Sequence, residues 1–192
     1  WDGSKVPEKA TECVLNYTFD DNLTNSGTAG EEENLVLGKG TSAAKYVNGV
    51  EGKAFYFDGT TYLASPNKTY SYDEMTVSFY YMMEEYNSTD TGANMVVVPA
   101  GLGALGGGVI DFEFMKEADS DNVQFLVKMN SSNWQVQDKL YTEASVKVNE
   151  WHCYTVVFQN TYDNDGAIDA AYVSVYVDGE RTDRMELSVA AG

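Results

Sequence analysis

The stretch Gly52–Leu63, with the sequence GKAFYFDGTTYL, gives the first indication of the fold. Phe55 and Phe57 alternate with their neighbours, and this period of two is typical of a half-buried strand. Asp58-Gly59 comes next, and glycine accepts the positive φ of a tight turn because it has no Cβ. β-forming residues resume directly after the turn. The stretch therefore predicts a strand, a tight turn and a returning strand that together make a hairpin.

The same alternation recurs along the chain in short segments that are joined by turn-rich loops. No long helix and no internal repeat stand out. Many short strands at this spacing predict an all-β fold, an antiparallel sandwich of two sheets. Besides the hairpin, we expect strands at Glu12–Phe19, Leu35–Leu37, Lys45–Val47, Met75–Met83, Met95–Val98, Val109–Met115, Val123–Met129, Trp134–Val136, Trp151–Gln159, Ala171–Val177 and Met185–Val189.

Length and composition indicate one globular domain. The chain has 192 residues, of which 43% are hydrophobic, which is enough for a core. Residues 1–11 are polar, and we expect them to form a linker or an N-terminal arm. We expect residues 12–192 to form a single β-sandwich domain. The most apolar run, residues 95–110, is broken by proline and glycines and is shorter than the ~20 residues that span a bilayer, so we expect no membrane insertion.

The charge of the chain restricts its partners. The formal net charge is −18, from 30 acidic and 12 basic residues. A field of this sign repels nucleic acid, anionic membranes and polyanionic glycans. Neutral glycans, cations and basic protein patches remain open as partners. The alternative is that the acidic surface only keeps the protein in solution.

The two cysteines leave two interpretations open. Cys13 and Cys153 both lie in expected strands, and no CxxC motif or Cys/His cluster accompanies them, which argues against structural zinc. They form one disulfide in an oxidising compartment, or they are two buried free thiols.

Four motifs together resemble the laminin-G-like, concanavalin A-type jelly-roll family, in its bacterial form. They are Tyr17–Asp20 (YTFD), the Gly52–Leu63 stretch, Asn149–Phe158 (NEWHCYTVVF) and Val173–Glu180 (VSVYVDGE). The resemblance implies an antiparallel two-sheet jelly roll and a non-catalytic recognition module of a secreted or cell-surface protein. We accordingly expect a carbohydrate-binding, lectin-like module with neighbouring domains in a larger protein. A protein-binding adhesion or structural module is the alternative, and a glycan hydrolase or lyase is a third.

The sequence departs from the family pattern at three places. Tyr80 stands where the family usually has tryptophan, and Cys153 replaces the second histidine of a Trp-His-His stretch. His152, the only histidine, is then expected to be structural. No closing strand of the family type precedes Gly192. Either the chain ends before that strand, or Met185–Val189 takes its place.

Sugar binding requires a flat aromatic surface with polar groups around it. Tyr80 alternates with the expected core residues of Met75–Met83, so its side chain is expected on the open face of that strand. Trp134 follows a polar run and is the second main candidate. Tyr86, Asn133 and Gln135 are expected to support them. For each residue, the alternative is a place in the core or a plain exposed position.

Calcium is the cofactor that the resemblance implies, as a structural ion. The family often binds calcium at an edge of the sandwich, and the matching position is Asp20 of YTFD. Asp58 is a second possible ligand, although shaping the turn before Gly59 is an equally good role for it.

No catalytic pattern is recognisable, so we expect no enzyme. Asp111 and Glu113 lie two apart on one strand, but Lys116 stands where laminarinase-type enzymes of the superfamily have a third acid. We expect the two carboxylates to lie on a solvated outer face. The string Gly101–Gly106 matches a dinucleotide-binding motif, but no helix follows it, and we expect a sheet connection there.

Overall fold

The computed structural model describes residues 12–40, 43–66, 74–84, 95–98, 109–116, 122–130, 136–141 and 146–187. These residues belong to two compact units, and the boundary between the units falls between Lys68 and Thr69. We call residues 12–66 the N-terminal unit and residues 74–187 the sandwich unit. The prediction of a single domain over residues 12–192 stays a prediction.

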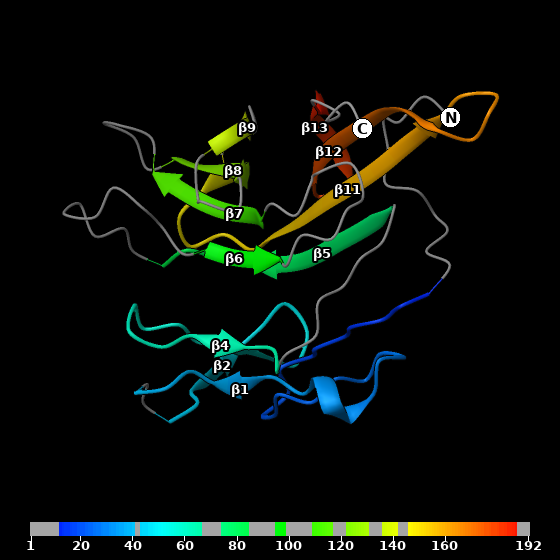
Figure 1. Ribbon diagram of the computed structural model, residues 1–192. Helices are drawn as coiled ribbons and strands as arrows, with labels where there is room; N and C mark the ends of the chain where they lie inside the picture. Colours follow the sequence, from blue (N-terminus) through cyan, green and yellow to red (C-terminus); the bar gives the residue numbers. More distant parts are fainter. Residues whose placement is uncertain are drawn as a thin grey trace. The chain divides into compact units, whose positions relative to one another are not determined.

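One sheet of the sandwich unit has four antiparallel strands. They are β5 (Met75–Tyr81), β11 (His152–Tyr162), β12 (Ile168–Val177) and β13 (Glu180–Leu187). Their order is β13-β12-β11-β5, and Figure 1 shows β11 between β5 and β12. The pairing of β11 with β12 runs from Tyr154↔Val177 to Tyr162↔Ile168. The two long strands β11 and β12 therefore form the centre of the four-stranded sheet.

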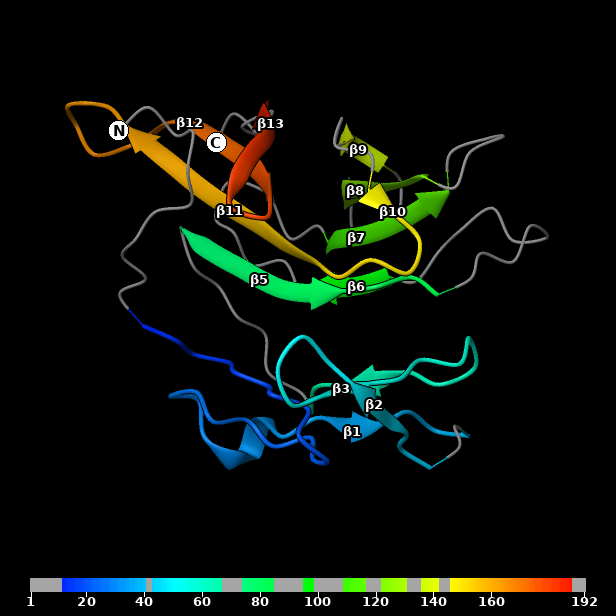
Figure 2. The ribbon, with the colours of Figure 1, turned by 180° about the vertical axis from the view of Figure 1, so that it is seen from behind.

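The second sheet of the sandwich unit has five strands. They are β6 (Met95–Val98), β7 (Val109–Lys116), β8 (Asn122–Asn130), β9 (Val136–Tyr141) and β10 (Val146–Lys147). The order is β10-β8-β7-β6, and β9 pairs with β8 as well. All of these pairings are antiparallel. Figure 2 shows β8 and β7 between β9 and β6.

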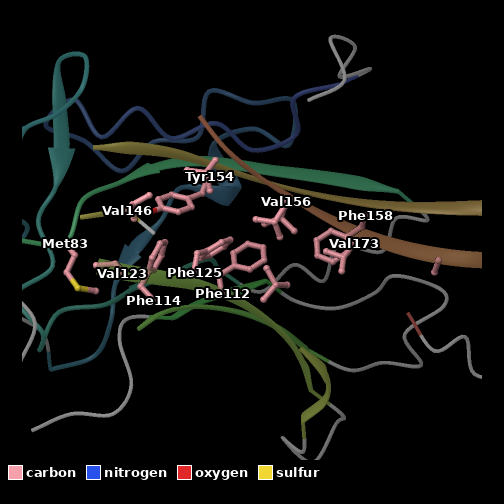
Figure 3. Packing of buried hydrophobic residues seen from close by; sticks show 14 residues of the cluster. Met83, Phe112, Phe114, Val123, Phe125, Val146, Tyr154, Val156, Phe158 and Val173 are labelled. Carbon is pink, nitrogen blue, oxygen red and sulfur yellow. The ribbon is translucent and has the colours of Figure 1, made fainter. Parts of the chain in front are cut away.

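The two sheets pack face to face around an aromatic core. Phe79 of β5 lies 6.0 Å from Phe112 of β7 between ring centroids, and Phe125 of β8 lies 5.0 Å from Tyr154 of β11. Figure 3 shows Phe112, Phe114 and Phe125 directed from one sheet toward Tyr154 and Val156 of the other. Alternate residues of β5, from Met75 to Tyr81, complete this core. The predicted all-β, antiparallel two-sheet sandwich is confirmed.

The N-terminal unit has little regular structure. Its elements are the 3-10 turn Glu31–Glu33 and the strands β1 (Val36–Leu37), β2 (Tyr46–Asn48), β3 (Lys53–Phe55) and β4 (Leu63–Ala64). Strand β2 pairs with β3, and β1 pairs with β4. The predicted hairpin of residues 52–63 is therefore wrong, because its two strands form but pair with other partners. The turn between them is present, and Gly59 has a φ of 81°.

The predicted strand Glu12–Phe19 is also wrong. Its carbonyl groups accept hydrogen bonds from residues 26–29, but the Asn16 amide donates to the Asn25 side chain, 2.8 Å away, instead of to a partner strand. Phe19 has a φ of 60°, which a strand does not tolerate. The segment is an irregular arm held by turn residues. It is not part of a sheet.

Among the described residues, no helix is long and apolar enough to cross a lipid bilayer.

Candidate functional site

Tyr80 lies on the outer face of the four-stranded sheet, which is exposed along β5 but buried at Thr155 of β11 and Tyr176 of β12. Its side chain is 59% exposed, whereas Phe79 and Tyr81 on either side of it pack against the core. The alternation of β5 explains this, because successive side chains of a strand point to opposite faces. Exposed and partly buried residues alternate along the whole strand. The position predicted for Tyr80 is therefore confirmed.

Polar groups of β5 and β11 surround Tyr80 on the same face. Cys153 is its Cα partner across the ladder, and Ser78 is paired with Thr155. The Ser78 and Thr155 hydroxyl oxygens are 2.8 Å apart, and Ser78 Oγ lies 3.6 Å from Cys153 Sγ. We call Tyr80, Ser78, Cys153 and Thr155 the Tyr80 platform. Thr155 is only 4% exposed and supports the platform from below, so a ligand meets the ring of Tyr80 and the exposed hydroxyl of Ser78. A flat ring with a polar group beside it is what a sugar ring requires.

The sequence did not reveal the polar half of this platform. Alternation alone places Ser78 on the same face as Tyr80, but Cys153 and Thr155 lie about 75 residues away along the chain. Their proximity to Tyr80 follows from the register of β5 with β11, in which Cys153 faces Tyr80. A sequence pattern does not determine which strands pair.

The other residues predicted to contact sugar are Trp134, Tyr86, Asn133 and Gln135. They lie outside the described residues.

Asp20 holds a turn of the N-terminal unit. Its Oδ1 accepts a hydrogen bond of 2.7 Å from the Lys53 backbone amide. Gly52, beside Lys53, has a φ of 61°, and a Cβ added there would lie 2.2 Å from Asp20 Oδ1. The carboxylate therefore approaches the backbone closely, at a position that only glycine accommodates.

Asp58 shapes the turn that follows β3. Its Oδ1 accepts hydrogen bonds from the Thr60 amide, the Thr60 hydroxyl and the Thr61 amide, at 2.8–2.9 Å. These bonds from Thr60, and then those from Thr61, lower the pKa of Asp58 to about 2, because they favour the ionised carboxylate. The turn-shaping role that the sequence left open is thus present.

The described residues contain no group of three or more acidic, histidine or cysteine side chains that could hold a metal ion. Asp20 and Asp58 each use one carboxylate oxygen to fix their own turn. The described carboxylates therefore do not build a calcium site by themselves, and the prediction of calcium at Asp20 or Asp58 stays a prediction.

Glu113 corrects one expectation about the second sheet. The sequence placed it on a solvated face, but it is only 7% exposed. It does lie on the face opposite Phe112 and Phe114, as the alternation of β7 requires. Its Cα partner on β8, Leu126, is 1% exposed. The outer face of this sheet is therefore covered around Glu113, and alternation cannot distinguish a covered outer face from an open one.

A small hollow lies at one end of the sandwich core, lined by residues that include Tyr81, Met83, Glu150 and Tyr154. It has no space for a water molecule. Burial raises the pKa of Tyr154, and the nearby Asp178 and Tyr81 raise it further, so that its hydroxyl stays neutral. The hollow cannot accept a sugar ring as it stands.

The fold and its open platform define a protein of the two-sheet antiparallel β-sandwich class. A family model described as the Concanavalin A-like lectin/glucanases superfamily matches residues 57–191, which is more than half of the chain. The chain belongs to this superfamily. No curated protein and no solved structure matches it. The membership supports a carbohydrate-binding or related module in general, with carbohydrate or protein as the partner.

Proposed function

We propose that the chain is a non-catalytic carbohydrate-binding module that recognises neutral glycans on the Tyr80 platform. The observation that carries the proposal is the 59% exposure of Tyr80, on the face of β5 that also exposes Thr76 and Ser78. A pyranose ring stacks on such a ring through its C–H groups, and nearby hydroxyls bind its polar edge. The exposed Ser78 hydroxyl supplies that edge, and the buried Thr155 hydroxyl, 2.8 Å from it, holds it in place.

Charge supports the choice of neutral glycans. The chain carries a formal net charge of −18, which disfavours sulfated and uronic-acid-rich chains. Uncharged sugars meet no such repulsion. We place the module in an extracellular or cell-surface protein, next to other domains, and keep calcium in the proposal as a structural ion.

The proposal excludes catalysis. Glycoside hydrolysis requires two carboxyl groups that flank the scissile bond. Glu113, one of the two carboxylates considered from the sequence, is 7% exposed, and its burial argues against a place beside a surface-bound sugar.

The test begins with a glycan array, probed with the intact protein in calcium and again in chelator. The affinity for any glycan that binds is then measured for Tyr80→Ala and Tyr80→Phe. We expect Tyr80→Ala to weaken binding about two- to tenfold, since an aromatic stacking contact contributes about 0.5–1.5 kcal/mol. Tyr80→Phe should retain most of the affinity. Loss of binding in chelator would support the ion.

Tyr162→Ala is the matched control. Tyr162 lies in the same sheet, at the far end of β11, and is 49% exposed. This variant should bind as the wild type does. Equal binding by Tyr80→Ala and wild type, or equal losses in Tyr80→Ala and Tyr162→Ala, would contradict the platform.

A protein-binding module is the second candidate, because the N-terminal unit exposes apolar side chains. Val36 and Tyr62 are 49% and 51% exposed. They lie on one face of the β1–β4 ribbon, where Val36 pairs with Ala64 and the Gly38 amide donates to the Tyr62 carbonyl. Exposed apolar patches mark protein contacts. An array without any binding would favour this candidate over the first.

A further inference from the structure

Asp178 fixes the start of β11 from the turn between β12 and β13. Its backbone amide donates to the Cys153 carbonyl at 2.8 Å, and its Oδ1 accepts from the Cys153 amide at 2.9 Å. Its other oxygen, Oδ2, lies 2.7 Å from His152 Nδ1. The backbone of Asp178 adopts a φ of 52°, an unusual value for a residue other than glycine. One carboxylate thus holds both the backbone of β11 and the imidazole.

This contact determines which nitrogen of His152 carries a proton. Partial burial of Asp178 raises its pKa, but the hydrogen bonds from His152 and from the Cys153 amide outweigh burial, and the pKa is lowered overall. The carboxylate is therefore ionised near neutral pH and only accepts hydrogen bonds. The hydrogen must then lie on Nδ1, which leaves Nε2 without one in the neutral imidazole.

Nε2 faces a second carboxylate. It is buried, has no hydrogen-bond partner among the described residues, and lies 3.6 Å from Glu150 Oε2. In the neutral imidazole, the lone pair of Nε2 is directed toward a negative oxygen, which is unfavourable. A proton on Nε2 turns this contact into an attraction and places one cation between Glu150 and Asp178.

We propose that protonation of His152 strengthens the contacts of the β10–β11 connection and the β12–β13 turn with the start of β11. We call this arrangement the clamp. The three segments meet at the imidazole through Glu150, Asp178 and His152 itself. The clamp tightens this end of the sandwich as the pH falls below neutral and loosens it as the pH rises. It does not depend on what the protein binds.

Other charged and titratable groups lie on the elements next to His152. Tyr81 of β5 is the Cα partner of His152, and Lys147 of β10 lines the hollow together with Glu150 and Tyr154. Glu180 follows the turn at the start of β13. Carboxylates, lysines and tyrosines ordinarily titrate outside pH 5.5–8, and burial moves the pKa of Tyr154 further from this range. The part of the pH dependence that a substitution of His152 removes therefore reports the clamp.

The sign of the effect follows from linkage. A proton that binds more tightly to the folded chain than to the unfolded chain stabilises the fold at low pH, and this stabilisation is lost as the pH rises. The many carboxylates of the chain also respond to pH, but those away from His152 respond alike in the wild type and in a His152 variant. Asp178, which His152 contacts, has a lowered pKa and stays ionised throughout this pH range. The difference between the two proteins at each pH therefore isolates the imidazole.

The experiment measures Tm at several values from pH 5.5 to pH 8, in chelator so that no metal ion contributes. His152→Asn keeps an N–H donor near Asp178 but cannot take up a proton. We expect the Tm of the wild type to exceed that of His152→Asn by about 2–4 °C more at pH 5.5 than at pH 8. Glu150→Gln should lose a large part of this pH dependence.

Glu186→Gln is the matched control, because it removes the same charge from an exposed position on β13. Its pH dependence should equal that of the wild type. A Tm difference between wild type and His152→Asn that does not change with pH would overturn the proposal. So would a Glu150→Gln variant that behaves as the wild type does.

A second measurement needs no variant. Because the chain has a single histidine, every imidazole signal in an NMR spectrum comes from His152. Long-range nitrogen–proton correlations at high pH should show the Nδ1–H tautomer in the folded protein. The Nε2–H tautomer would contradict the geometry and overturn the clamp, whatever the stability of the variants.

Discussion

Different forces stabilise each of the two units of this protein. The sandwich unit has long strands and a continuous apolar core, in which Phe112, Phe125 and Val156 are at most 1% exposed. The N-terminal unit has strands of two or three residues, and the side-chain amide of Asn25 connects three of its backbone groups. The first unit therefore depends on buried apolar surface, and the second on a few hydrogen bonds between side chains and backbone.

This difference implies different weak points. Core packing depends on volume, so the sandwich should respond to the loss of a large side chain in its centre. A turn-rich unit depends on satisfied donors and acceptors, so it should respond to the loss of a single polar group. The predictions below follow from this contrast, in order of expected size.

The largest effect is expected for Phe125→Ala in the sandwich unit. Phe125 is 1% exposed, and its ring lies 4.9–6.1 Å from the rings of its four aromatic neighbours. The truncation should lower the free energy of unfolding by about 3–5 kcal/mol, measured by denaturant titration. Tyr162→Ala, at an exposed position, should change it by less than about 0.5 kcal/mol. Similar values for the two variants would mean that the aromatic core does not dominate this unit.

A smaller effect is expected for Asn25→Ala in the N-terminal unit. Asn25 is 6% exposed, and its Oδ1 accepts from the Asn16 and Gly27 amides, while its Nδ2 donates to the Gly30 carbonyl. Removal of the amide leaves these backbone groups without their partner and should cost about 1–3 kcal/mol. Hydrogen exchange at the Asn16 and Gly27 amides should accelerate accordingly.

Asn25→Asp sharpens this test. It keeps the acceptor for the two amides but loses the donor to Gly30, so we expect a smaller acceleration than for alanine. Unchanged exchange in Asn25→Ala would show that apolar contacts, such as the ring of Phe55 against Phe57 at 4.8 Å, hold this unit instead.

The smallest effect concerns the pH dependence of the Asp58 turn. Hydrogen bonds from Thr60 and Thr61 lower the pKa of Asp58 from 3.8 to about 2. A depressed pKa means that the turn is stabilised at higher pH, and that this contribution is lost as the pH falls from about 4 through 2. The NMR shifts of the Thr60 and Thr61 amides should titrate with a midpoint near 2. Asp58→Asn should abolish this titration, and a midpoint near 3.8 would refute the turn geometry.

The same contrast explains what the sequence could reveal. In the sandwich unit, the strand period follows directly from burial on one face: a strand was predicted at Met75–Met83, and β5 begins at Met75 with alternating burial. Strand β13 was expected only from Met185, because Glu180–Arg184 is too polar to show a hydrophobic period, although it pairs with the central strand β12. Periodicity reports burial, and it does not detect a strand whose side chains are mostly polar.

In the N-terminal unit the sequence was a poorer guide. Alternation in Glu12–Phe19 indicated a strand, but the side chain of Asn25 takes up a backbone amide that a sheet would have paired. In the candidate site, too, the sequence predicted one part and did not reveal the other. The exposure of Tyr80 followed from the period of β5, whereas the neighbours Cys153 and Thr155 follow from strand register, which the sequence does not specify.

The two cysteines have a practical consequence. Both are free thiols, with Cys13 exposed in the N-terminal unit and Cys153 less accessible in the sandwich unit beside Ser78. A maleimide dye should therefore react first with Cys13, and a second dye of another colour can follow at Cys153. Each unit then carries its own fluorescent reporter without an engineered residue, and the melting of the two units can be recorded separately in a single sample.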